Sequence, residues 1–262
     1  MPLLEVQNIT HRFGGLVALD KVGFLVAQGQ IKSIIGPNGA GKTTLLNVIS
    51  GLLPSGAGRI TFKEKRINGL KPHQIARAGM SRTFQNPSLF LQMSVLENVM
   101  VGRHCRTRSG FSSCCLRLPG QIREEKRIRE AAMEQIRYVG LEGLAEVEAG
   151  ALGFGERRMV ELARALATEP SLLLLDEPAS GLNSRETEDL GEHIRRIAEK
   201  GITVLLVEHD MSLVMTVSDD ILVLDNGARL AEGAPSVIQN NEEVIRVYLG
   251  SGFEHVASSR KP

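Results

Sequence analysis

The stretch Gly36-Pro37-Asn38-Gly39-Ala40-Gly41-Lys42-Thr43 lies between an apolar run, Gln30 to Ile35, and a helical pattern, Lys42 to Ser50. It matches the pattern G-x-x-x-x-G-K-[ST], and a strand before it and a helix after it are the context that the pattern requires. Glycines let the backbone wrap closely, so several N–H groups converge on an anion at a helix N-terminus, where the helix dipole favours negative charge. The stretch therefore predicts a phosphate-binding loop in an α/β fold.

Two side chains of this loop have specific expected roles. Lys42 is expected to reach the β- and γ-phosphates of a nucleotide, and the Thr43 hydroxyl is expected to bind Mg²⁺. We assign nucleotide binding to nine consecutive residues: Gly36, Pro37, Asn38, Gly39, Ala40, Gly41, Lys42, Thr43 and Thr44. The loop thus implies a nucleotide with β- and γ-phosphates, together with Mg²⁺.

Two carboxylates follow a fully apolar run, Leu172 to Leu175. In open α/β sheets the ligand crevice lies at the carboxyl ends of the strands. We expect Asp176 to assist the metal, directly or through water, and Glu177 to orient and deprotonate an attacking water. An apolar strand that ends in two solvated acids is the alternative, and the phosphate-binding loop earlier in the chain argues against it.

Short β-like runs alternate with helical stretches along most of the chain. The expected strands are 4–9, 22–26, 30–35, 59–62, 81–84, 171–175, 203–207 and 221–224, and the expected helices among them are 42–50, 72–78, 186–200 and 211–217. This order predicts an α/β core with a largely parallel sheet and an antiparallel contribution from the first sixty residues.

The segment from 88 to 167 has helical periodicity at 94–103, 121–139 and 156–167 and no convincing strand. We interpret it as a helical subdomain inserted into a core formed by residues 1–87 and 168–250, with 251–262 as a flexible tail. Its stretch from Arg103 to Arg123 carries arginines and no acidic residue. That stretch is a solvated loop or, alternatively, a contact with a membrane surface or membrane partner.

Composition limits the function. The 262 residues carry 31 Lys+Arg and 30 Asp+Glu, with 42% hydrophobic residues, so the chain is expected to fold and has no broad basic charge for nucleic acid. No apolar run approaches the ~20 residues that cross a bilayer, and the start does not resemble a secretory signal. Three cysteines, at 105, 114 and 115, make a disulfide framework improbable and fit a reducing, cytoplasmic compartment.

Four further elements complete a pattern: Gln85 after a strand, Leu152 to Arg158 at the start of a helix, Ser180 to Asn183 after the acidic pair, and His209 after another strand. Each alone is common in loops. In this order and spacing, from Leu3 to about Gly250, they resemble the ATP-binding-cassette (ABC) ATPases. The resemblance implies a P-loop NTPase fold with a RecA-like parallel-sheet core, an antiparallel β subdomain and an inserted helical subdomain.

Finer features resemble the branched-chain amino-acid importer type, specifically the first of its two ATPase subunits. They are Phe13 to Leu16, Arg82 to Gln85, Gly181 to Asn183, Glu208 to Met215 and the stretch from Val244 to Gly250. The lipopolysaccharide-export type shares Gly155 to Arg158 and the ending Val247 to Gly250. Other solutes, such as other amino acids, amides, urea-like compounds or aromatic acids, remain open.

The resemblance implies that two cassettes pair head to tail and hold ATP between the phosphate loop of one and the signature of the other. The nucleotide-binding signature residues here are Gly153, Phe154, Gly155 and Glu156, at a helix expected to start near Glu156. Phe13 would stack on adenine, while Gln85 and His209 would sense the γ-phosphate and act in catalysis with Glu177. Gln85 would also join Thr43 and Asp176 around the metal.

The partners implied by the resemblance are a second cassette, identical or different, two transmembrane permeases and, indirectly, an extracytoplasmic solute-binding protein. The segment Gln85 to Phe90 would help form a groove for a permease helix, placing the chain at the cytoplasmic side of the inner membrane. Two residues depart from the family: Gly153 replaces the usual serine and Asn183 the usual aspartate. Loss of the serine hydroxyl removes one donor to the γ-phosphate.

Two other classes of function compete with transport. A soluble cassette ATPase that acts on ribosomes or DNA usually carries two cassettes or a coiled-coil insertion, and this chain shows neither. A regulatory module without turnover gains some support from Gly153. The retained Lys42, Glu177 and His209 favour an active ATPase.

Overall fold

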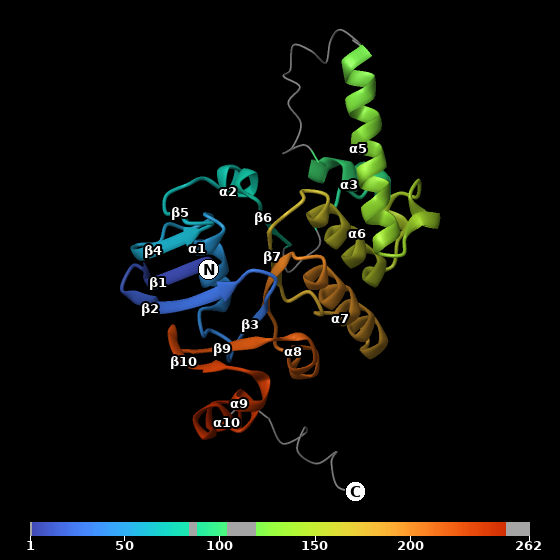
Figure 1. The fold of residues 1–262 in the computed structure, drawn as a ribbon. Helices are drawn as coiled ribbons and strands as arrows, with labels where there is room; N and C mark the ends of the chain where they lie inside the picture. The colour runs from blue at the N-terminus through green and yellow to red at the C-terminus, as the bar shows by residue number, and fades with distance from the viewer. Residues whose placement is uncertain (1, 84–87, 104–118, 250–262) are drawn as a thin grey trace, which may run out of the picture.

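The structure, a computed structural model, describes residues 2–83, 88–103 and 119–249. Two sheets and a group of helices make up this part of the chain (Figure 1). Gln85, the three cysteines, most of the basic stretch 103–123 and the tail 251–262 lie outside the described residues, so the predictions for them stay predictions.

The strands are β1 (Pro2–Phe13), β2 (Leu16–Ala27), β3 (Ile31–Ile35), β4 (Ala57–Phe62), β5 (Lys65–Arg66), β6 (Met80–Arg82), β7 (Leu172–Asp176), β8 (Thr203–Val207), β9 (Asp220–Asp225) and β10 (Ala228–Gly233). The helices are α1 (Lys42–Ile49), α2 (Pro72–Ala78), α3 (Val95–Arg103), α5 (Pro119–Tyr138), α6 (Phe154–Leu166), α7 (Ser184–Glu199), α8 (Met211–Val217), α9 (Pro235–Gln239) and α10 (Glu242–Leu249), with short 3₁₀ turns at Glu142–Leu144 and Ala149–Ala151.

The larger sheet has six strands in the order β10-β9-β3-β8-β7-β6. All neighbours from β9 to β6 are parallel, and only β10 runs antiparallel. Every residue of β3, β7 and β8 is buried, as expected when helices cover both faces of a parallel sheet. The predicted parallel core is therefore confirmed, and it aligns the carboxyl ends of β3, β7 and β8 at one edge.

The smaller sheet is antiparallel, in the order β2-β1-β4-β5. It lies beside α1 and the larger sheet, with β1 and β2 in blue and β4 in cyan in Figure 1. Apolar residues of both sheets, including Ile9, Phe62 and Leu205, share one buried cluster with Leu46 of α1. The antiparallel contribution of the first sixty residues is confirmed, although it extends to Arg66.

Helices α3, α5 and α6 pack together, and no strand occurs among the described residues from 88 to 167. Val99 of α3, Ile136 of α5 and Leu162 of α6 belong to the same buried cluster as Leu173 and Leu206 of the larger sheet. The helical part therefore packs directly on the sheet through a continuous apolar core.

The prediction from sequence patterns did not include four elements of the structure: β5, β10, α9 and α10. The apolar pattern of β10 is interrupted by Arg229 and Glu232, whose charges are satisfied by an ion pair between them. Glu232 also pairs with Lys32, a lysine buried within β3, which only the folded sheet brings close. Among the described helices, none is both long enough and apolar enough to cross a bilayer.

Candidate functional site

The loop from Gly36 to Gly41 connects β3 to α1 and wraps tightly against the rest of the sheet. A Cβ atom on Gly36 would lie 2.2 Å from the Leu224 carbonyl oxygen, so no larger residue fits. Gly41 has φ 96° and caps α1, and a Cβ there would lie 2.6 Å from the Ala18 carbonyl oxygen. The glycines thus allow both the close approach and the left-handed conformation that turn backbone N–H groups toward an anion.

Lys42 begins α1 and is only 7% exposed. Its Nζ donates to the carbonyl oxygens of Gly36 at 2.7 Å and Pro37 at 3.0 Å, which holds the ammonium over the loop. Burial lowers the pKa of Lys42, and the nearby carboxylates of Glu177 and Asp176 oppose that shift. This fixed ammonium beside backbone N–H groups is suited to a polyanionic phosphate chain.

Thr43 and Thr44 lie in the first turn of α1, which contains no acidic residue. Thr43 is exposed and Thr44 is half-buried, so neither side chain is closed off in the core. The pattern is typical of a helix start that receives an anion, because no side-chain carboxylate competes for the positive end of the dipole.

Asp176 ends β7 and is 3% exposed. Its Oδ2 accepts from Arg82 on the neighbouring strand β6 at 2.8 Å. The other amino group of the guanidinium donates to Asn47 of α1 and to Ser50, which caps the end of that helix, both at 2.8 Å. Arg82 therefore connects the acidic strand end to the helix after the phosphate loop, a function that the sequence analysis did not assign to it.

Glu177 follows directly and has φ 47°, a strained conformation for a residue with a side chain. Its backbone N–H donates to the Val207 carbonyl oxygen at 2.8 Å, which fixes the turn against β8. The carboxylate lies 3.9 Å from His209 Nδ1. Strain of this kind is common where a side chain must be aimed at a reacting group.

Glu208 has no exposed surface, yet it carries a carboxylate between the two functional loops. One oxygen accepts from the Ala179 N–H at 2.7 Å, and the other accepts from the N–H groups of His209 and Asp210 at 2.9 and 3.3 Å. Burial raises the pKa of Glu208, and these backbone donors oppose the shift. Glu208 thus links the turn after Glu177 to the loop that carries His209.

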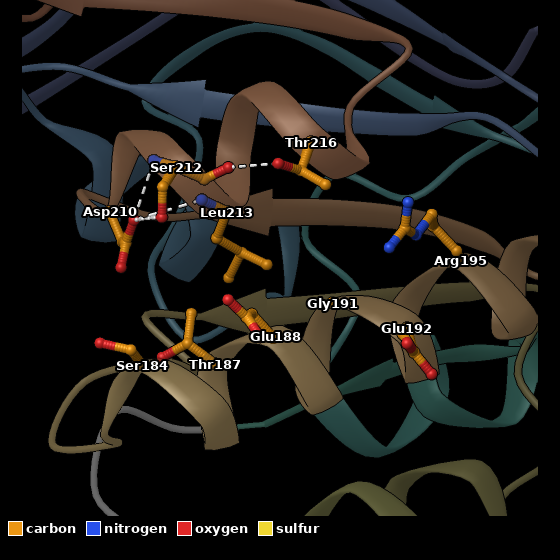
Figure 2. A pocket seen from close by; sticks show the side chains of 10 residues that line it. All are labelled: Ser184, Thr187, Glu188, Gly191, Glu192, Arg195, Asp210, Ser212, Leu213 and Thr216. Atoms are coloured by element: carbon orange, nitrogen blue, oxygen red, sulfur yellow. Dashed lines mark hydrogen bonds between the residues drawn. The ribbon is translucent and has the colours of Figure 1, made fainter. Parts of the chain in front are cut away.

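The imidazole of His209 is 60% exposed and lies 3.7 Å from Glu208. Directly after it, the Asp210 carboxylate caps α8 by accepting from the N–H groups of Ser212 and Leu213 at 2.9 and 3.2 Å. Figure 2 shows these bonds beside a cavity of about 390 Å³ between α7 and α8. The cap fixes the start of α8, so His209 projects from an anchored turn.

The start of α6 differs from the start that the sequence predicts. The helix begins at Phe154, two residues before the predicted start, with Gly153 as its cap in an extended conformation. The Glu156 carboxylate accepts from the Gly153 N–H at 2.8 Å. Phe154 is 46% exposed and lies against Gly181, while Gly155 lies against Glu186 at the start of α7.

Phe13 ends β1 and is 49% exposed. Its ring meets the His11 ring edge-on at a centroid distance of 4.6 Å. The following strand of the same hairpin touches the phosphate loop, because Ala18 and Leu19 lie against Gly41. An exposed aromatic ring therefore stands on a hairpin that borders the loop.

The fold gathers Lys42, Asp176, Glu177, Glu208 and His209 at one edge of the larger sheet. It does not bring the start of α6 there: α6 lies with α3 and α5, apart from α1 (Figure 1). Arg82 and Glu208 are additions to the predicted set. The signal for Glu208 was a charged residue directly after the apolar strand β8, whereas Arg82 is the last residue of the short strand β6 and had no comparable signal.

Two family models match the chain. The model described as ABC transporter covers residues 19–180, and the model described as branched-chain amino acid ATP-binding cassette transporter covers residues 228–254. The chain is 44% identical over 250 residues to the high-affinity branched-chain amino acid transport ATP-binding protein BraF of Pseudomonas aeruginosa, covering 95% of this chain and 98% of that protein.

Solved structures agree in fold. An ATP-binding cassette of an ABC transporter in its ADP conformation superposes with a TM-score of 0.84 at 35% identity, covering 95% of this chain and 99% of that one. A cassette solved as a dimer in a post-hydrolysis state, bound to ADP and phosphate, gives a TM-score of 0.75 at 26% identity, covering 88% and 98%.

Proposed function

The chain belongs to the family of ABC transporter ATP-binding subunits, and we propose that it hydrolyses ATP to power the import of branched-chain or related amino acids. The observation that carries the proposal is the convergence of a buried lysine on the phosphate loop with two carboxylates at the end of β7.

Nucleotide binding is assigned to the loop from Gly36 to Thr44. Its backbone N–H groups and the Lys42 ammonium neutralise the phosphates, and the half-exposed Phe13 offers a flat surface for adenine at the bordering hairpin. Hydroxyl and carboxylate oxygens are the ligands that Mg²⁺ prefers, and Thr43 and Asp176 supply them at the two sides of the loop. The metal, when bound, neutralises charge that develops on the phosphates.

Hydrolysis is assigned to Glu177 and His209. Glu177 accepts a proton from the attacking water, since its carboxylate is held by a fixed turn and remains partly exposed. His209 contacts the γ-phosphate from an anchored turn, and its distance of 3.9 Å from Glu177 allows it to orient that carboxylate. Gln85 is proposed as a further contact to the metal and the water.

A second cassette completes the site. The start of α6, from Gly153 to Glu156, lies apart from the phosphate loop of its own chain, so its N–H groups are available to the nucleotide of a neighbour. The relative solved as a dimer with ADP and phosphate supports such an arrangement. ATP then joins two cassettes, identical or different, and hydrolysis weakens the junction.

Two permeases are the proposed membrane partners. Phe90, Leu91 and Met93 are exposed apolar side chains just before α3, and clustered exposed apolar residues commonly mark a protein interface. Such contacts would hold the chain at the cytoplasmic face of the membrane. Residues 1–87 and 168–250 would then form the catalytic core. Residues 88–167 would form the helical subdomain that transmits the closing of two cassettes to the permeases.

Branched-chain amino acids are the proposed solutes because residues 228–254 match the corresponding family model and BraF carries that name. The permeases and a separate binding protein select the solute, so the test is uptake. Deleting the gene should abolish uptake of labelled leucine, and restoring it should recover uptake. Intact leucine uptake with loss of an amide or urea-like solute would replace the proposed substrate while leaving the ATPase assignment in place.

The catalytic assignment is tested by Glu177→Gln. We expect ATP binding to persist while steady-state hydrolysis with the permeases falls about 10²-fold to 10⁴-fold, the range for loss of a general base. Glu188→Gln, an exposed position on α7, removes the same charge and should leave hydrolysis unchanged. Normal turnover in Glu177→Gln would rule out Glu177 as the base.

A further inference from the structure

Glu208 lies in the interior although it is acidic, and its hydrogen-bond partners are all backbone N–H groups. One carboxylate oxygen accepts from Ala179 at 2.7 Å, and the other accepts from His209 and Asp210 at 2.9 and 3.3 Å. No lysine or arginine among the described residues forms an ion pair with Glu208. Each of the two oxygens therefore serves a different loop.

Burial of this carboxylate opposes folding. A carboxylate loses hydration when it leaves water, and backbone donors return only part of that free energy. The five residues of β8 directly before Glu208 are all buried, and four of them are aliphatic, so an apolar side chain would suit position 208 better for stability alone. What Glu208 contributes is therefore sought in the groups that it holds in place.

Contacts of Val207 and Glu208 fix the backbone on both sides of Glu177. The Glu177 N–H donates to the Val207 carbonyl oxygen at 2.8 Å, and Ala179, two residues further along, donates to Glu208. Glu177 has φ 47°, a conformation that residues with a side chain keep only when their surroundings hold it. Glu208 also holds the N–H of His209, whose imidazole lies 3.9 Å from the Glu177 carboxylate. Glu208 thus bonds to the loops that carry both groups assigned to hydrolysis.

We propose that Glu208 is a positioning residue for hydrolysis, and that its two carboxylate oxygens hold Glu177 and His209 at one fixed spacing. The inference rests on the proposed function, because it assumes that these two side chains act on the attacking water and the γ-phosphate. A misplacement of about 1 Å can lower a rate about 100-fold, so a small change in this spacing is enough to slow hydrolysis.

The phosphate loop is held by other contacts. The Lys42 ammonium donates to the carbonyl oxygens of Gly36 and Pro37, whereas the hydrogen bonds of the Glu208 carboxylate go to no residue of this loop. Loss of the Glu208 carboxylate is therefore expected to slow turnover and to leave ATP affinity in place. A general loss of structure would change both.

The test is Glu208→Gln, which keeps the shape of the side chain and replaces one acceptor oxygen by an NH₂ donor. The amide can then accept from one loop only, and the other loop loses its acceptor. We expect the kcat for ATP hydrolysis, measured with the permeases, to fall about 10-fold to 100-fold, while the Kd for Mg-ATP stays within about twofold of the wild type.

Glu208→Ala is the second variant, because its small side chain leaves room for water to satisfy the freed N–H groups. It should show the same fall in kcat at an unchanged Kd. Asp219→Asn is the matched control. Asp219 also accepts a backbone N–H, that of Ile31 at 2.8 Å, but it does so at the opposite end of the sheet, where β3 and β9 begin. This control should leave kcat and Kd unchanged.

A second readout shows whether Glu208 acts through Glu177. In single-turnover hydrolysis, Glu208→Gln should lower the rate by a much smaller factor in the Glu177→Gln background than in the wild type, because the base that it positions is already lost. An effect on folding alone would lower both rates by the same factor.

The outcomes for this inference differ from those for the proposed function. Wild-type kcat in both Glu208 variants would overturn the positioning role, and so would an equal fall of kcat in Asp219→Asn. A rise in Kd that matches the fall in kcat, or an equal factor in both backgrounds, would overturn it as well, since the effect would then be general. A wild-type chain that hydrolyses no ATP with its permeases, or normal turnover in Glu177→Gln, would instead overturn the proposed function.

Discussion

The start of α1 and the start of α6 both expose backbone N–H groups at a helix N-terminus, but they are built in opposite ways. α1 is preceded by glycines in left-handed conformations, has no acidic residue in its first turn and carries the buried ammonium of Lys42. α6 is capped in an extended conformation by Gly153, and its own Glu156 accepts the N–H of that cap residue. The first is therefore organised for an anion in advance, whereas part of the second is occupied by its own carboxylate.

This difference suggests that the two helix starts contribute unequally to ATP binding. The α1 site is complete within one chain and should account for most of the affinity for ATP. The α6 site has no side-chain hydroxyl at Gly153 and carries the negative charge of Glu156, so it should contribute less and act only when two cassettes meet. Three substitutions test this division.

The largest effect is expected at Lys42. Lys42→Ala removes a charged donor from the loop, so we expect the Kd for Mg-ATP to rise about 10-fold to 100-fold in calorimetric titration. Lys65→Ala, an exposed lysine of β5, removes the same charge elsewhere and should have no such effect. Because burying the ammonium lowers the pKa of Lys42 and costs free energy, thermal stability should not fall with affinity. If Lys42→Ala bound Mg-ATP as tightly as the wild type, the α1 site would not supply most of the affinity for ATP.

A smaller gain is expected at Gly153. A Cβ there would meet only Glu156 Oε2 at 3.5 Å, and no positive φ opposes a side chain, so Gly153→Ser is tolerated. The added hydroxyl supplies a donor to nucleotide held by a second cassette, and ATP-dependent pairing should strengthen about threefold to tenfold. Sedimentation in the Glu177→Gln background measures it.

Gly143→Ser is the control for this gain. Gly143 also has open space around a Cβ position and no positive φ, but it lies in the 3₁₀ turn Glu142–Leu144. It should leave pairing unchanged. If both serine variants pair alike, the start of α6 does not touch the nucleotide.

The smallest effect is expected at Glu156. Glu156→Gln keeps an acceptor for the Gly153 N–H and removes the negative charge at the start of α6. Pairing through ATP should strengthen about twofold to fivefold, the effect of one charge near a helix end, and the gain should shrink in high salt. Glu134→Gln on the exposed side of α5 serves as the control. Weaker pairing would mean that the Glu156 carboxylate itself assists the junction.

The elements that local patterns predict well are those whose boundaries have local causes. The ranges of β8, α2 and α8 agree with prediction because an apolar run, a proline at the first helical position and the capping Asp210 define them. β10 was missed because Arg229 and Glu232 interrupt its apolar pattern. α10 does carry apolar residues at helical spacing, including Val244 and Tyr248, so its signal was present in the sequence but was not assigned to a helix. α6 begins two residues before its predicted start. Glu156 is the third residue of the helix, and its carboxylate accepts from the N–H of the cap residue Gly153.

The sequence alone determined the nature of the phosphate loop and the acidic strand end, since glycines, a lysine and two carboxylates at fixed spacing have few other uses. Only the tertiary structure decided how that site is held: Arg82 lies on Asp176, and Glu208 lies between two loops. The physical reason is range. Backbone conformation and capping act over a few residues, whereas these contacts join segments that approach only when the sheet and its helices bury their apolar faces together.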